Sequence, residues 1–146
     1  MGREVRRVPK DWVHPMNESG SYYKPLLEGY TRRANLFMEM ANTKGLQEAV
    51  DYFGGAPDKE RHMPEWPAEE CTHLMMYENT SEGTPISPAF LTPEELAQWL
   101  ADTGASSFGS MTAPYEQWLR TCRSGWAPSA VVVGGELTSG VAALKP

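Results

Sequence analysis

The stretch from Glu78 to Ser87 reads ENTSEGTPIS and is rich in side chains that can move protons or accept hydrogen bonds. Its two carboxylates could act as a general acid and a general base, although only a buried cleft would tune them for this task. The competing interpretation is a turn whose Asn, Thr and Ser side chains bond the local backbone, with a glycine at a special φ. The candidate site residues here are Glu78, Ser81, Glu82, Thr84 and Ser87.

Nucleophilic catalysis needs a serine or cysteine beside a base that a third group orients. His73 is a candidate base, and Glu78 or Glu82 could orient it. Its candidate nucleophiles are Ser81, Ser87 and Cys122. These spacings are not diagnostic, because almost any domain offers similar combinations. We therefore assign no catalytic residue, and the sequence favours a binding protein over an enzyme.

The histidines and cysteines are too dispersed to predict a metal site. None of the close pairs that zinc sites use, such as CxxC or HxxxH, occurs among His14, His62, His73, Cys71 and Cys122. Neither of the glycine-rich patterns GxGxxG and GxxxxGK is present, so no phosphate-binding loop is predicted. We expect no metal and no cofactor.

A second group of candidates lies near the N-terminus, where three arginines precede a tryptophan and a histidine. Aromatic rings beside arginine and hydroxyl groups are typical of recognition sites. A nucleobase stacked on an aromatic ring, with arginine on its phosphate, would use the same residue types. The competing interpretation places the arginines on a solvated strand face and the aromatic rings in the core. Together with Tyr77, these candidates are Arg3, Arg6, Arg7, Trp12 and His14.

The chain has 146 residues and a formal net charge of −6. This balance argues against nucleic acid as the partner, because phosphate contacts need clustered Lys and Arg. Residues 58–102 are strongly acidic, which fits either a mimic of nucleic acid or an ordinary soluble surface. No apolar run approaches the ~18 residues of a membrane span, and the two distant cysteines fit reduced thiols. We expect a cytoplasmic protein with no membrane partner.

The best-marked helix is predicted to begin at Pro93 and to end before Gly104. Thr92 is a good N-cap, Pro93 suits the first helical position, and Glu95 completes a capping box. Gly104 is suited to end the helix in a left-handed conformation. The side chains expected on its apolar face are Leu96, Trp99, Leu100 and Thr103.

Three further helices are predicted from the spacing of apolar residues. Two of them cover residues 30–42 and 46–53, and Gly45 separates them. In the first, Met38 is expected to fill a gap in the core. The other begins after an N-cap at Thr112.

Strands are predicted at three places. Residues 3–8 are expected to form an edge strand that stops at Pro9. Residues 72–78 alternate in a way that predicts a strand with one face buried, and a short helix beginning at Pro67 is the alternative. The apolar run at 130–133, a Gly-Gly turn and a returning strand at 136–141 predict a C-terminal β-hairpin.

The predicted outline is an α+β fold in which a small, mostly antiparallel sheet packs against three or four helices. A chain of this length fits one domain, over residues 1–146. A variable, proline-rich loop is expected around residues 54–67. In that region, His62 is expected at the surface, and Trp66 between two prolines is expected to plug a groove.

Two blocks of the sequence resemble a family of small proteins encoded by tailed bacteriophages and prophages. The first is REVRRVPKDWVHP, and the second runs through SEGTPISP, TPEELAQWLADTGASSFG, YEQWL, APSAVVV and SGV. The resemblance covers about residues 2–16 and 63–142, whereas the tract at 17–60 varies among the relatives. It brings no catalytic residue to carry over. It implies an accessory gene expressed inside a bacterium, where small phage proteins often inhibit host defence.

Three hypotheses follow. The first is a non-enzymatic phage accessory protein that binds and inhibits a host component, such as a bacterial defence factor. The second is a protein that sequesters a nucleotide-like small molecule with the arginines, Trp12 and the 78–87 turn. The third is a small hydrolase. The expected partners are therefore a host protein or a nucleotide-like molecule, and self-association into a homo-oligomer is left open.

Overall fold

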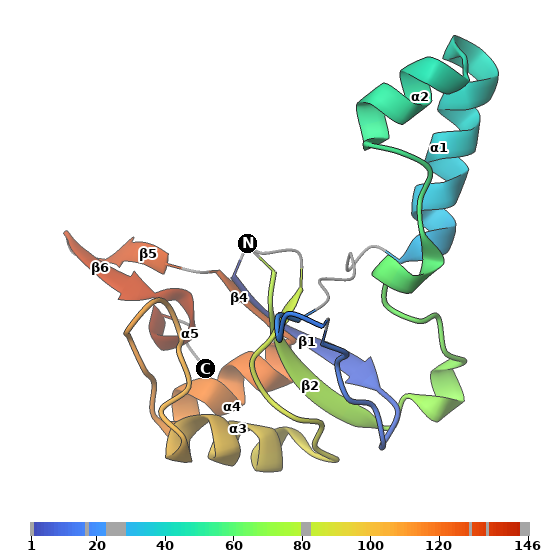
Figure 1. The fold of residues 1–146 in the computed structure, drawn as a ribbon. Helices are drawn as coiled ribbons and strands as arrows, with labels where there is room; N and C mark the ends of the chain where they lie inside the picture. Colours follow the sequence, from blue (N-terminus) through green and yellow to red (C-terminus); the bar gives the residue numbers. More distant parts are fainter. Residues whose placement is uncertain are drawn as a thin grey trace. The chain divides into compact units, whose positions relative to one another are not determined.

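A computed structural model describes residues 2–16, 18–22, 29–79, 83–128, 130–133 and 135–143 (Figure 1). The strands are β1 (Gly2–Val8), β2 (His73–Glu78), β3 (Thr84–Pro85), β4 (Trp126–Pro128), β5 (Ala130–Val133) and β6 (Glu136–Ser139). The helices are α1 (Tyr30–Lys44), α2 (Leu46–Phe53), α3 (Pro93–Asp102), α4 (Tyr115–Ser124) and α5 (Gly140–Ala143). Short 3-10 helices cover Lys59–Arg61 and Ala68–Glu70. These elements form an α+β fold, as predicted.

The chain divides into two compact units. The first, which we call the sheet unit, joins Met1–Pro15 to Trp66–Pro146 and holds every strand named above. The second, which we call the helical unit, covers Met16–Glu65 and holds α1 and α2. The expectation of a single domain over residues 1–146 stays a prediction.

The sheet unit is built on four antiparallel strands in the order β3-β2-β1-β4. The predicted edge position of β1 is wrong, because β2 pairs with one side of this strand and β4 pairs with the other. Pro9 lacks an N–H donor, but it lies beyond the last residue of β1 and removes no hydrogen bond from either ladder. A strand that ends before its proline is therefore free to lie inside the sheet.

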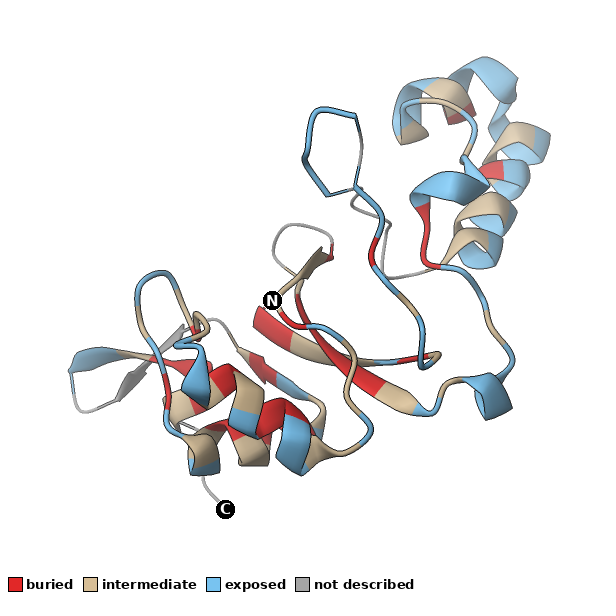
Figure 2. Ribbon diagram, turned by 60° about the horizontal axis from the view of Figure 1, so that its bottom comes forward, coloured by how far each residue is buried: buried red, intermediate tan, exposed pale blue. Residues whose placement is uncertain are grey.

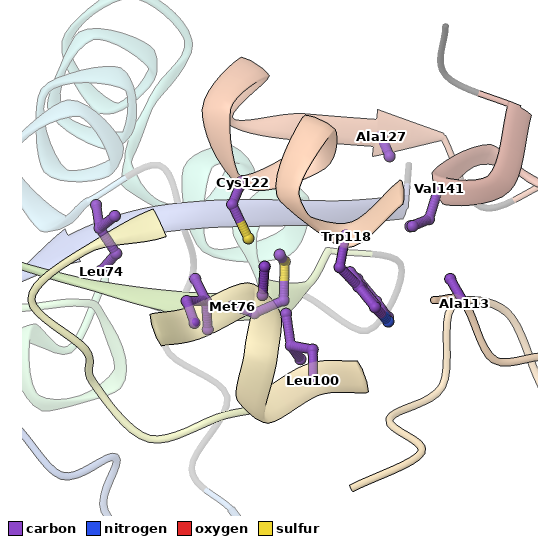
Figure 3. Packing of buried hydrophobic residues seen from close by; sticks show 10 residues of the cluster. Leu74, Met76, Leu100, Ala113, Trp118, Cys122, Ala127 and Val141 are labelled. Atoms are coloured by element: carbon purple, nitrogen blue, oxygen red, sulfur yellow. The ribbon is translucent and has the colours of Figure 1, made fainter. Parts of the chain in front are cut away.

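One face of the sheet carries the main core, and α3 and α4 cover that face (Figure 3). Leu74 and Met76 point from β2 toward these helices, as the two-residue period of a strand requires. Leu96 and Leu100 from α3 and Trp118 from α4 meet them there, and all three are fully buried.

The strand β2 is buried on both faces, whereas the sequence predicts only one buried face (Figure 2). Met75 and Tyr77 alternate with the core residues and are also buried. The chain after β1 returns over this second face, where Trp12 and His14 contact Tyr77. The prediction was wrong because alternation within β2 does not reveal what a distant segment covers.

The predicted start of α3 is confirmed. Thr92 accepts a hydrogen bond from the backbone N–H of Glu95 at 3.1 Å, and Pro93 occupies the first helical position. The predicted N-cap at Thr112 is wrong, because α4 begins after Pro114. The residue before a proline is disfavoured in helical conformation, so the helix cannot extend back across Pro114 to Thr112.

The C-terminal hairpin is confirmed as an antiparallel pair of β5 and β6, in a separate two-stranded sheet. Its second strand is shorter than the predicted range 136–141, because the chain turns into α5 at Gly140. Ser139 marks this change, since its hydroxyl accepts a hydrogen bond from the backbone N–H of Ala142 at 3.1 Å.

The helical unit consists of α1 and α2, which Gly45 separates at φ 101°, as predicted. Two predictions for this unit are wrong. Met38 is 55% exposed rather than in the core, because the side of α1 that is buried is the one that carries Phe37. His62 is buried rather than at the surface, and its ring packs edge-on against Tyr30 with 5.8 Å between centroids.

Candidate functional site

The three arginines of β1 do not form one basic surface. Arg3 lies opposite Ala127 of the core face, and Arg7 lies opposite the core residue Leu74. Arg6 points to the other face, because side chains alternate along a strand. The sequence-predicted strip is therefore divided between the two faces of the sheet.

Arg3 has a structural role. It is 4% exposed, and its guanidinium donates to the backbone oxygen and the hydroxyl of Ser106 at 3.0 Å and 3.2 Å. Burial lowers the pKa of Arg3, and the opposed Glu78 carboxylate acts in the other direction. Thr84 lies beside Glu78 on the neighbouring strand β3. Arg3 thus ties β1 to the loop that follows α3.

Ser87, at the end of the polar turn, has a structural role. Ser87 is buried, and its hydroxyl accepts from the N–H of Met76 at 3.0 Å and donates to the oxygen of Pro88 at 2.8 Å. Both of these partners are backbone atoms, and one of them lies on β2. Ser81 and Glu82 lie outside the described residues.

Three candidates come together on the face of the sheet opposite the core. The Tyr77 hydroxyl accepts a hydrogen bond from Trp12 Nε1 at 3.1 Å and lies 2.9 Å from His14 Nδ1. Trp66 packs edge-on against Trp12, with ring centroids 4.9 Å apart. Burial raises the pKa of Tyr77, while the Trp12 hydrogen bond and the charge of Arg6 oppose the shift. We call Trp12, His14, Trp66 and Tyr77 the aromatic cluster.

Replacing Tyr77 with Phe is expected to lower the free energy of unfolding by about 1–3 kcal/mol, because Trp12 Nε1 and His14 Nδ1 both lose their hydroxyl partner inside the protein. Urea unfolding of the full chain measures this loss. Tyr52→Phe is the matched control, since Tyr52 is 73% exposed and its change should stay within about 0.5 kcal/mol. Equal losses in the two variants would contradict a structural role for the cluster.

A row of partly exposed side chains lies beside the aromatic cluster on the same face. Glu4 of β1 is opposite Tyr77 on one side and opposite Trp126 of β4 on the other. Trp126 is 46% exposed, and Glu4 forms an ion pair with Arg6 at 3.3 Å. The Nε of Arg6 is shielded from solvent and has no hydrogen-bond partner among the described residues. We call Glu4, Arg6 and Trp126 the Trp126 patch.

Sequence reasoning found Arg6 but missed Glu4 and Trp126. The three residues of β4 are too few to show alternation, so nothing in the sequence indicated that this segment pairs with β1. The pairing of β1 with β4 shows that Trp126 lies beside Glu4, because directly opposed residues of antiparallel strands project from the same face.

Among the described residues, the candidate nucleophiles Ser87 and Cys122 are not activated for catalysis. Burial raises the pKa of the Cys122 thiol to about 12, and the Glu94 carboxylate adds to the shift. Cys122 belongs to the helix-covered core, whereas His73 lies opposite Val8 on a strand position that alternates with the core residues. The Ser87 hydroxyl is already hydrogen-bonded to two backbone partners. Neither Ser87 nor Cys122 therefore resembles an activated nucleophile.

The thiols should differ in reactivity. At pH 8 in the native protein, we expect an alkylating reagent to modify the half-buried Cys71 and to leave Cys122 unmodified, because the buried thiol stays protonated. Mass spectrometry of the intact chain counts the added groups, and denatured protein serves as the control in which both thiols react. Rapid modification of native Cys122 would contradict its assignment to the core.

Within the described ranges, no group of three or more His, Cys, Asp or Glu residues is arranged to hold a metal ion. A search of the same residues finds no helix with the length and apolar character that crossing a membrane requires. The Trp126 patch offers aromatic contact together with a carboxylate and a guanidinium.

Comparison of the chain with known proteins gives no match among family models, curated proteins or solved structures.

Proposed function

We propose that this chain is a non-enzymatic phage accessory protein that binds and inhibits a host component, and that the Trp126 patch contacts it. The exposed Trp126 beside the Glu4–Arg6 ion pair is the observation that carries this proposal. Tryptophan and arginine are enriched among the residues that dominate binding energy at protein interfaces. A rigid strand also presents them with little conformational freedom to lose on binding.

The rest of the candidate site supports binding rather than catalysis. Arg3, Tyr77 and Ser87 are buried and hydrogen-bonded within the fold, so they would hold the sheet under the patch. The phage-like sequence blocks supply the context of an inhibitor of host defence, such as a factor that restricts phage growth. Such a role needs only a stable surface, which this sheet provides.

A phage-plating assay tests the biological part of this proposal. A bacterium whose defence restricts a phage would express the wild-type chain, Trp126→Ala or the control Leu137→Ala, which alters another exposed apolar residue. We expect the wild type and the control to restore plating and Trp126→Ala to fail. Unchanged plating with the wild type, together with no captured host protein, would overturn the proposal.

The second candidate function is sequestration of a nucleotide-like molecule by the same patch. The exposed Trp126 indole beside the partly exposed Arg6 guanidinium favours this function. A guanidinium binds phosphate through its terminal N–H groups, and an exposed indole can stack on a base. Calorimetric titration with a panel of cyclic and linear nucleotides tests this function, with Arg6→Ala as the comparison. Flat titrations of the wild type would remove it and leave a protein partner as the proposed target.

A further inference from the structure

The helical unit presents an apolar groove of about 330 Å³ between its two helices. The groove is lined by Arg33, Leu36, Glu39, Met40, Thr43, Lys44, Tyr52 and Phe53. Leu36 is 40% exposed and Tyr52 is 73% exposed, so large apolar side chains border an open surface. Contiguous patches of large apolar side chains are rare on the surface of monomeric proteins, and they often mark binding sites.

The groove persists because two helices cannot cover each other completely. Within α1 and α2, Phe37 and Ala49 are the buried residues, and Phe37 and Phe53 pack edge-on at 5.9 Å. This contact between α1 and α2 occupies one side of each helix. The side of α1 that borders the groove therefore stays exposed to solvent. In helix bundles, a second pair of helices normally covers such a side.

The charges of the two helices indicate which partner molecule would cover the groove. The helix α1 carries three basic residues and a single acidic one, whereas α2 carries two acidic residues and no basic one. In α1 the charged residues are Arg32, Arg33, Glu39 and Lys44, and in α2 they are Glu48 and Asp51. Arg33 and Lys44 line the groove, and Glu48 and Asp51 line the adjoining hollow beside Lys44. A second copy that brings its α2 to α1 therefore places acidic side chains near basic ones.

We propose that a second copy of this chain covers the groove, with α1 of each copy against α2 of the other around a two-fold axis. In such an interface each contact occurs twice, so the basic helix meets the acidic helix in both halves. The opposite arrangement, with α1 against α1, would place like charges together. Each exposed Tyr52 then packs into the groove of the other copy, as an aromatic anchor.

Sedimentation equilibrium of the full chain over micromolar concentrations tests the dimer. We expect the wild type to have twice the monomer mass and Tyr52→Ala to raise the dissociation constant by about thirtyfold or more, the range of an aromatic anchor. Met38→Ala is the matched control, because Met38 is 55% exposed on α1 but does not line the groove. A monomeric wild type would overturn the proposal, and so would a Tyr52→Ala dimer as tight as the wild type.

A charge-exchange experiment tests the pairing of the helices. One variant carries Glu48→Lys and Asp51→Lys, and the other carries Arg32→Glu and Lys44→Glu. Each variant alone should be monomeric, because its two helices carry charge of the same sign. Mixing them should give a one-to-one heterodimer, since each basic helix again meets an acidic one. Absence of the heterodimer would overturn the α1-to-α2 arrangement.

The dimer does not depend on the proposed function. Trp126→Ala alters the patch in the sheet unit and should dimerise as the wild type does, while Tyr52→Ala tests the helical unit. Loss of host binding and loss of dimerisation are therefore separate results.

Discussion

Replacing Trp118 with alanine is expected to lower the free energy of unfolding by about 4 kcal/mol. Trp118 is fully buried between α4 and the sheet, where Met76, Leu96 and Leu100 belong to the same cluster (Figure 3). Removing the indole takes away its burial and leaves a cavity that neighbouring side chains only partly fill. Urea denaturation of the full chain measures the change.

Trp126→Ala is the matched control, because it removes the same side chain from a site that is 46% exposed. Its loss should be smaller, about 1–2 kcal/mol, since only about half of the indole is buried and no enclosed cavity is left. This result would also show that Trp126→Ala is a fair probe of binding. Similar losses at the two tryptophans would contradict the assignment of Trp118 to the core and of Trp126 to the surface.

Replacing Gly140 with alanine is expected to cost about 3 kcal/mol, at the upper end of the range for overpacking. A Cβ atom at Gly140 would lie 1.9 Å from the backbone oxygen of Pro128 and 2.5 Å from its Cγ. A backbone oxygen cannot rotate away as a side chain does, so α5 must move away from β4. Thermal and urea unfolding of the variant measure the loss.

Gly20→Ala separates this clash from the ordinary effect of replacing a glycine. Gly20 has a φ of +83°, and nothing lies within 4 Å of a Cβ built there. Its cost should therefore be only the conformational strain of an alanine with positive φ, about 1–2 kcal/mol. If Gly140→Ala were tolerated better than Gly20→Ala, the close approach of α5 to Pro128 would be contradicted.

The elements that the sequence predicted well are those with local signals. The start of α3 follows from Thr92, Pro93 and Glu95, whose side chains act within one turn of helix. The bounds of α2 follow from the glycines on either side of it, Gly45 and Gly54. The α+β fold class follows from the sum of these local elements.

The features that the sequence did not predict depend on distant pairing. The central position of β1 requires knowledge of β4, which contacts it from more than a hundred residues away. The exposure of Met38 depends on which sides of α1 other segments cover, and periodicity alone does not show this. Thr112 failed as a cap because Pro114 sets a stricter limit on where the helix begins.

The candidate site was predicted in part. Trp12, His14 and Tyr77 were chosen by residue type and do come together, although as a hydrogen-bonded cluster within the fold. Arg3 and Arg6 were grouped by their closeness in sequence, yet they lie on opposite faces because a strand alternates. Trp126 is assigned to the site because the pairing of β4 with β1 places it opposite Glu4.

Quantitative affinity capture from a bacterial lysate tests the proposed binding surface most directly. The bait would be the wild-type chain, Trp126→Ala or Leu137→Ala, each shown by circular dichroism to be folded. We expect the wild type and Leu137→Ala to recover the same host protein in similar amounts and Trp126→Ala to lose it. Equal recovery by Trp126→Ala, or no specific recovery by the wild type, would contradict a role of the Trp126 patch in binding a host protein.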